Sequence, residues 1–154
     1  ILLYITFTFR KLSYGVAAVT ALLHDLLILF GMYAVLARFG AEIDTLFITA
    51  VLTTMSFSVH DTIVMFDKIR EYKKTSGLDI EILANKALTE TIVRSVNNSL
   101  TIILMLVPLT FFGGDAVKFF AAALLIGTVT GTYSSPCIAT PLLVLLERRR
   151  STSH

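Results

Sequence analysis

The sequence predicts an all-α protein: a polytopic helical membrane bundle with about four full transmembrane helices, one partial helix and a cytoplasmic surface helix. Two observations lead to this prediction. Of the 154 residues, 55% are hydrophobic and the mean hydropathy is +0.79, whereas apolar residues make up at most about half of an ordinary globular chain. The apolar residues also gather into several runs of about 20 residues, the length that crosses a bilayer as a helix.

The chain opens with an apolar segment, residues 1–10, which ends in the basic pair Arg10 and Lys11. This segment is too short to cross a bilayer. Its basic residues follow the apolar part, whereas those of a signal peptide precede it. We therefore expect a partial transmembrane helix whose beginning is absent, and a chain that is a fragment of a longer protein.

Two apolar runs follow, and each is long enough to span a membrane. The first covers residues 15–38 and contains one acidic residue, Asp25. The second covers residues 43–66 and is interrupted by His60 and Asp61. The short polar segment between the runs predicts a turn.

Residues 67–93 are predicted to form a cytoplasmic loop that leads into an amphipathic helix. The charged start of this segment contains Ser76 and Gly77, which favour a turn. Further on, apolar side chains recur every three or four positions, and polar side chains take the opposite face. We expect this helix to lie at the membrane surface and to lead into the next span. The apolar stripe consists of Ile80, Leu83, Ala84, Ala87, Leu88, Thr91 and Ile92.

Two further spans complete the predicted bundle, at residues 95–112 and 117–146, with a glycine-rich turn between them. The second span is longer than a bilayer requires, so it must tilt, protrude or kink. Pro136 and Pro141 are the expected kink sites. Residues 147–154 form the predicted cytoplasmic tail.

The basic residues predict the orientation of the spans, because cytoplasmic flanks carry an excess of Lys and Arg. If the spans alternate in direction, eleven of the 13 Lys and Arg residues fall on one side, and Arg38 and Lys118 fall on the other. Both termini are therefore expected in the cytoplasm, in a multi-pass protein of the cell (inner or plasma) membrane. We interpret the basic clusters as membrane flanks rather than as a surface for nucleic acid.

Four ionisable residues, His24, Asp25, His60 and Asp61, lie within or at the edge of apolar spans, and Arg94 stands where another span begins. A charge at the centre of a membrane helix costs about 2.5–3.5 kcal/mol, so such residues usually face protein or a water-filled cavity. Adjacent helical residues point about 100° apart. His60 and Asp61 are therefore not expected to form a catalytic dyad.

Two interpretations of these five residues stay open. In the first they form a proton relay, carried by Asp61 and Arg94, with His60, Asp25 and His24 as weaker candidates. In the second they are structural. His24 then bonds a carbonyl group of a neighbouring helix, and Asp25 pairs with a Ser or Thr of another span. Asp61 and Arg94 form a buried ion pair in that interpretation.

Other patterns indicate packing rather than chemistry. Gly127 and Gly131 form a GxxxG pattern, which permits close helix packing. The single cysteine, Cys137, is expected to be a packing residue. No Cys and His residues have the spacing of a metal site, and no nucleophile or phosphate-binding motif occurs. We therefore expect no enzyme, no metal and no cofactor besides the coupled proton.

Four segments resemble the SecF branch of the SecD/SecF family of protein-export membrane proteins. The most specific is VHDTIVMFDKIRE (59–71), which resembles the motif Asn-Asp-Thr-Ile-Val-Val-Phe-Asp-Arg-Ile-Arg-Glu and favours SecF over SecD. The others are ALLHDLLILFG (21–31), LTETIVRSVNNSLTIILML (88–106) and the FFGG turn (111–114). With the span pattern, the resemblance covers essentially the whole chain.

The resemblance implies a fold of the resistance-nodulation-division (RND) type, of which this chain holds the C-terminal membrane half. It implies a subunit that works with SecD and uses the proton-motive force to help the SecYEG translocon move a preprotein across the lipid bilayer. YajC is a further candidate partner. The family's relay aspartate and arginine correspond to Asp61 and Arg94. His60 departs from the motif, which usually has Asn there, so it either alters proton access or replaces one hydrogen-bonding group by another.

Two other function classes stay open. An RND-type proton-driven exporter of small molecules or lipids has the same architecture. A purely structural membrane module is the third class. The extracytoplasmic domain differs between the first two classes, and a proton-dependent measurement separates the third.

Overall fold

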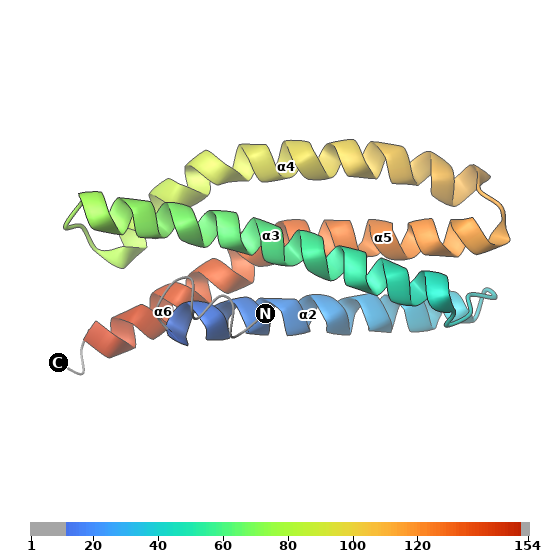
Figure 1. Cartoon of the computed structure of the whole chain (residues 1–154), viewed down its shortest axis with the longest axis horizontal. Helices are drawn as coiled ribbons and strands as arrows, with labels where there is room; N and C mark the ends of the chain where they lie inside the picture. Colours follow the sequence, from blue (N-terminus) through green and yellow to red (C-terminus); the bar gives the residue numbers. More distant parts are fainter. Residues whose placement is uncertain (1–11, 152–154) are drawn as a thin grey trace.

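The computed structural model describes residues 12–151, which confirm the predicted all-α membrane bundle. Four helical stretches are long and apolar enough to cross a membrane. The predicted partial helix at 1–10 and the end of the predicted tail, 152–154, lie outside the described residues. The helices are α2 (Leu12–Ala37), α3 (Thr45–Thr75), α4 (Ile80–Phe112), α5 (Asp115–Ser134), the π-helical turn η1 (Ser135–Ala139) and α6 (Thr140–Ser151) (Figure 1).

A tight turn joins α2 to α3, and its residues explain both helix ends. Gly40 has a φ of +96°, in the left-handed region that glycine adopts without strain. Asp44 caps α3, because its Oδ1 accepts a 2.8 Å hydrogen bond from the Phe47 amide. The Tyr33 hydroxyl donates to the Glu42 carbonyl at 3.0 Å, and the Tyr33 ring stacks on Phe47. These contacts fix the α2–α3 hairpin.

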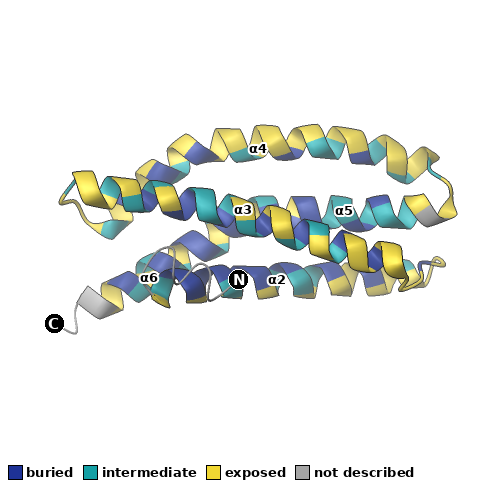
Figure 2. Ribbon diagram, in the orientation of Figure 1, coloured by how far each residue is buried: buried dark blue, intermediate teal, exposed yellow. Residues whose placement is uncertain are grey.

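Helix α4 joins two segments that were predicted from the sequence as separate elements. It runs without a break from Ile80 to Phe112, so the predicted amphipathic helix and the predicted span at 95–112 are one helix. Leu83, Ala84 and Ala87 of its apolar stripe are buried. Figure 2 shows buried segments near the start of α4 and a largely exposed helix beyond them. Ala84 and Ala87 belong to a core cluster with residues of α2, α3 and α6. Part of the apolar stripe therefore packs within the bundle, and the position of this helix at the membrane surface stays a prediction.

The last predicted span, 117–146, is bent. Helix α5 ends in η1, where the Thr140 amide donates to the Ser135 carbonyl, five residues back, and Pro136 lies at the start of the turn. Both π-turns and prolines bend helices, and Figure 1 shows α6 leaving at an angle to α5. Pro141 follows in the first turn of α6.

The interior consists of two apolar clusters with a polar layer between them. One cluster joins the start of α2 to the second half of α3, the start of α4, η1 and α6. The other joins the end of α2 to the starts of α3 and α5. Between these clusters the buried side chains are polar. The polar layer consists of Asp25, Thr54, Ser58, Thr62, Ser99, Thr128, Thr130, Ser134 and Ser135.

Gly127 and Gly131 lie where α5 packs against α3. A Cβ atom added to Gly127 would come within 2.5 Å of the Thr54 Cβ, and one added to Gly131 would lie 3.3 Å from the Ser58 Cβ. The lack of side chains at these two positions lets α3 and α5 approach closely within the polar layer.

Candidate functional site

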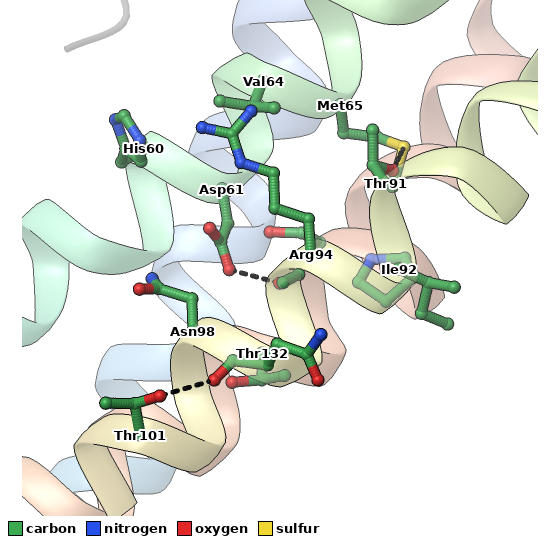
Figure 3. Close-up of a pocket in the computed structure, with 14 residues that line it drawn as sticks. His60, Asp61, Val64, Met65, Thr91, Ile92, Arg94, Asn98, Thr101 and Thr132 are labelled. Carbon is green, nitrogen blue, oxygen red and sulfur yellow. Dashed lines mark hydrogen bonds between the residues drawn. The ribbon is translucent and has the colours of Figure 1, made fainter.

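An open cleft between α3 and α4 contains Asp61 and Arg94 (Figure 3). Its volume is about 420 Å³, which admits several water molecules at about 30 Å³ each. Residues of α5 and η1 also line it, so the cleft reaches the edge of the polar layer. Its polar lining consists of His60, Asp61, Thr91, Arg94, Ser95, Asn97, Asn98, Thr101, Thr132 and Ser135.

Asp61 extends from α3 into the cleft and is held there by α4. Its Oδ2 accepts a 2.6 Å hydrogen bond from the Ser95 hydroxyl (Figure 3). Sequence reasoning missed Ser95, although it directly follows the arginine that was singled out. The hydroxyl gives Asp61 a fixed position on the cleft wall.

Arg94 lines the same cleft from α4, but its side chain is exposed. Arg94 and Ser95 are adjacent on a helix and therefore point about 100° apart. This geometry brings the hydroxyl rather than the guanidinium against Asp61. Within residues 12–151 no ion pair joins Asp61 to Arg94. The structure therefore does not show the buried ion pair that was the alternative to a proton relay.

His60 lies at the rim of the cleft and is exposed. Figure 3 shows the side chains of His60 and Asp61 pointing apart, as helix geometry requires of neighbours. Asn97, Asn98 and Thr101 extend the polar surface along α4, and all three are exposed. The cleft therefore presents charged and amide groups outward from a helix that is apolar enough to span a membrane.

Asp25 lies outside this cleft, in the polar layer, and is buried with 7% of its surface exposed. Its Oδ2 accepts hydrogen bonds from the Ser58 hydroxyl at 2.5 Å and the Ser134 hydroxyl at 2.7 Å. The His24 Nδ1 lies 3.1 Å from the other carboxyl oxygen. Asp25 thus connects α2, α3 and α5. Sequence reasoning allowed a Ser or Thr partner for Asp25 but did not identify Ser58 or Ser134.

Ion pairs near the C-terminal end of α3 attach α6 to its neighbouring helices. The Lys73 Nζ lies 2.7 Å from the Glu147 Oε2, and the Glu147 side chain is 5% exposed. Arg148 lies 3.3 Å from Glu81 of α4. These contacts hold together the ends of the helices that frame the cleft. No group of three His, Cys, Asp or Glu side chains in the described part of the chain is arranged to hold a metal ion.

Comparison with known proteins gives the family. Residues 1–149 match the family described as protein export membrane protein SecD/SecF, C-terminal. The chain belongs to the SecD/SecF family. It is 52% identical over 155 residues to the protein translocase subunit SecF of Thermobaculum terrenum, and the matched region covers 97% of this chain and 49% of that protein. It is 39% identical to the protein translocase subunit SecDF of Thermus thermophilus, covering all of this chain and 20% of SecDF.

Solved SecDF structures have the same fold. A crystal structure of SecDF in a super-membrane-facing form matches 99% of this chain with a TM-score of 0.89 and 38% identity, and this match covers 20% of the SecDF chain. A second, of SecDF from Thermus thermophilus, described as a translocon-associated membrane protein, matches 96% with a TM-score of 0.85. The chain spans about half the length of the SecF relatives it matches.

Proposed function

We propose that this chain is the C-terminal membrane half of a SecF subunit that uses the proton-motive force, together with SecD, to promote preprotein translocation. One observation carries the proposal: a carboxylate and a guanidinium share an open cleft, large enough for several water molecules, in a bundle of membrane-length helices. The similarity to translocase subunits supports a transport role rather than an enzymatic one.

In the proposed relay, Asp61 alternates between a charged and a protonated form. A nearby guanidinium stabilises the charged carboxylate, and withdrawal from water favours the neutral acid. Arg94 is exposed on a long side chain, whereas Ser95 holds Asp61 in place. A small movement of α4 changes the distance between the two charges and so loads or releases the proton. His60 at the rim is a weaker member of this relay.

The proton gradient supplies enough free energy for such a step. One charge that crosses about 100 mV releases about 2.3 kcal/mol. An uncompensated charge at the centre of a membrane helix costs about 2.5–3.5 kcal/mol. Because these energies are similar, protonation of Asp61 can be coupled to a modest rearrangement of the helices around the cleft.

The outward polar groups of α4 support an association with SecD. Arg94, Asn97 and Asn98 are exposed on this chain, and polar groups that face lipid are costly unless protein or water satisfies them. In the fused relative of Thermus thermophilus, SecD and SecF sequences form one protein. We propose that SecD covers this face, while SecYEG, YajC and the preprotein are contacted by the complete complex.

The orientation predicted from the basic residues is part of the proposal. The charged ends of α3 and α6 then lie in the cytoplasm with the C-terminus, and the turn at Gly40 lies on the opposite side of the cell membrane. In this orientation the cleft lies towards the cytoplasmic half of the bilayer, because Asp61 is six residues, or about 9 Å of helix, from Asp67.

Replacing Asp61 by Asn in the full-length protein, assembled with SecD in inverted membrane vesicles, tests the proposal. We expect Asp61→Asn to abolish the part of preprotein translocation that an imposed proton gradient stimulates. Asp67→Asn, an exposed carboxylate on the same helix, is the matched control and should retain that part. Equal stimulation in both variants would overturn the proposal. Loss of gradient-driven small-molecule efflux with translocation intact would favour the RND exporter instead.

A further inference from the structure

Asp25 of α2 and Asp61 of α3 are on different helices, and both lie beside the segment of α3 that contains Ser58. Ser58 donates a 2.5 Å hydrogen bond to the Asp25 Oδ2. Ser58 precedes Asp61 by three residues, so the two lie on neighbouring faces of α3, about 4.5 Å apart along its axis. The Ser58 hydroxyl therefore lies between the buried carboxyl group of Asp25 and the surroundings of Asp61 in the cleft.

A small cavity connects Ser58 to Asp61. Both residues line it, together with Asn98, Ser99, Thr128, Thr132 and the apolar side chains of Phe57 and Ile102. Its volume is about 10 Å³, close to the minimum that holds one water molecule. Its far wall is also polar, because the Thr132 hydroxyl donates to the Ser99 hydroxyl at 2.5 Å. Asp61 lines the open cleft as well, so a polar route runs from the cleft to Asp25.

The second hydroxyl on Asp25 does not belong to this route. Ser134 donates to the same Oδ2 at 2.7 Å, but it lines neither the small cavity nor the cleft. It is completely buried, and its other contact is the Gly131 carbonyl at 3.3 Å. Ser58 and Ser134 therefore make nearly the same hydrogen bond to Asp25, and they differ in whether they also face Asp61.

Few kinds of side chain surround the carboxyl group of Asp25. His24 of α2 lies 3.1 Å from the Oδ1. Tyr133 of α5 packs edge-on against the His24 ring, with 5.7 Å between ring centroids. From α3 and α5, Ser58 and Ser134 bond the carboxyl group directly. The titratable neighbours of Asp25 are thus His24 and Tyr133, and the described part of the bundle shows no Lys or Arg bonded to it.

We propose that Asp25 is a second proton carrier of the bundle, which exchanges a proton with Asp61 through the Ser58 hydroxyl and one water in the small cavity. Protonated Asp61 gives its proton to the water, the water gives one to the Ser58 oxygen, and Ser58 passes its own hydroxyl proton to Asp25. One proton moves, Asp61 becomes a carboxylate and Asp25 becomes neutral. This inference rests on the proposed relay through Asp61, and it extends the path about one helical turn deeper into the bundle.

Proton flux separates this role from a purely structural one. The full-length protein with SecD is reconstituted into liposomes that contain a pH-sensitive dye, and a proton gradient is imposed. Ser58→Ala and Ser134→Ala are compared, because each removes one hydroxyl from the same Asp25 oxygen. Ser58→Ala keeps the Cβ atom that packs beside Gly131. We expect Ser58→Ala to lower the flux at least about tenfold, as loss of a proton-transfer group does, and Ser134→Ala to lower it about twofold at most.

Each outcome bears on the inference. If Asp25 only holds helices together, both serine variants lower the thermal stability and the flux to the same extent, and the inference is overturned. Equal flux in both variants, or a larger loss in Ser134→Ala, also overturns it. Asp25→Asn must lower the flux as strongly as Ser58→Ala. Normal proton flux in the Asp61→Asn variant would refute the proposed function itself. If Asp61→Asn abolishes the flux but Ser58→Ala conducts normally, only the further inference is refuted.

Discussion

A neutral hydroxyl, that of Ser95, holds Asp61 in the cleft, and no charged group does so in the described part of the chain. The 2.6 Å hydrogen bond fixes the carboxyl group, while Arg94 stays exposed beside it. A hydrogen bond to a charged group contributes about 1.5–3 kcal/mol. Asp61 is therefore positioned by a hydroxyl and not by an ion pair in the described part of the chain.

The role of Ser95 as a positioning residue is testable. Ser95→Ala removes a bond to a charged group, worth about 1.5–3 kcal/mol, so gradient-stimulated translocation should fall roughly tenfold or more. Thr89→Ala is the matched control on α4, because the Thr89 hydroxyl is exposed and donates only to the Asn85 carbonyl. Ser95→Thr should restore most of the activity, since it keeps the hydroxyl. Equal activity of the Ser95→Ala and Thr89→Ala variants would contradict the role.

The charged members of the site were predictable from sequence, and their hydroxyl partners were not. Asp61 and Arg94 stand out because charges are expensive in membrane helices. Hydroxyls in such helices often bond only the backbone of their own helix, as Thr20, Thr49 and Thr53 do here. Composition therefore does not separate them from Ser95, whose partner is on another helix.

At the scale of the element, periodicity predicted the helices but not their surroundings. The apolar stripe of α4 is present, and its residues Ala84 and Ala87 pack within the bundle. The helix continues through Arg94 because no residue there breaks it, and Pro108 lies near its end. Pro136 was the one sign of the π-turn η1 in the sequence, because a hydrogen bond between residues five positions apart does not require particular residue types.

The close approach of α3 and α5 gives a prediction about stability. Gly127→Ala places a Cβ within 2.5 Å of the Thr54 Cβ, so it should destabilise the protein by about 1–3 kcal/mol, the usual cost of overpacking. Gly31→Ala is the control, because nothing lies within 4 Å of its added Cβ and alanine favours a helix by about 1 kcal/mol. Thermal unfolding of the two full-length variants in detergent compares them. Equal melting temperatures would show that the bundle accommodates the added methyl group beside Thr54 at little cost in stability.

At the scale of the whole molecule, the bundle is a membrane-length apolar assembly with a polar middle. Two apolar clusters enclose the polar layer, and the cleft opens this layer towards the outside between α3 and α4. The sequence indicated the membrane class and the charged residues. It did not indicate the layer, because the layer forms only when serines and threonines from α3, α4, α5 and η1 meet in space.

Proton flux through the full-length protein, assembled with SecD in liposomes, is the most direct measure of whether the cleft between α3 and α4 conducts protons. We expect Asp61→Asn and Arg94→Ala to reduce gradient-driven flux to the level of empty liposomes, and Asp67→Asn to conduct like the unmodified protein. Normal conduction by Asp61→Asn, or no conduction by the unmodified complex, would contradict the claim that this cleft carries protons.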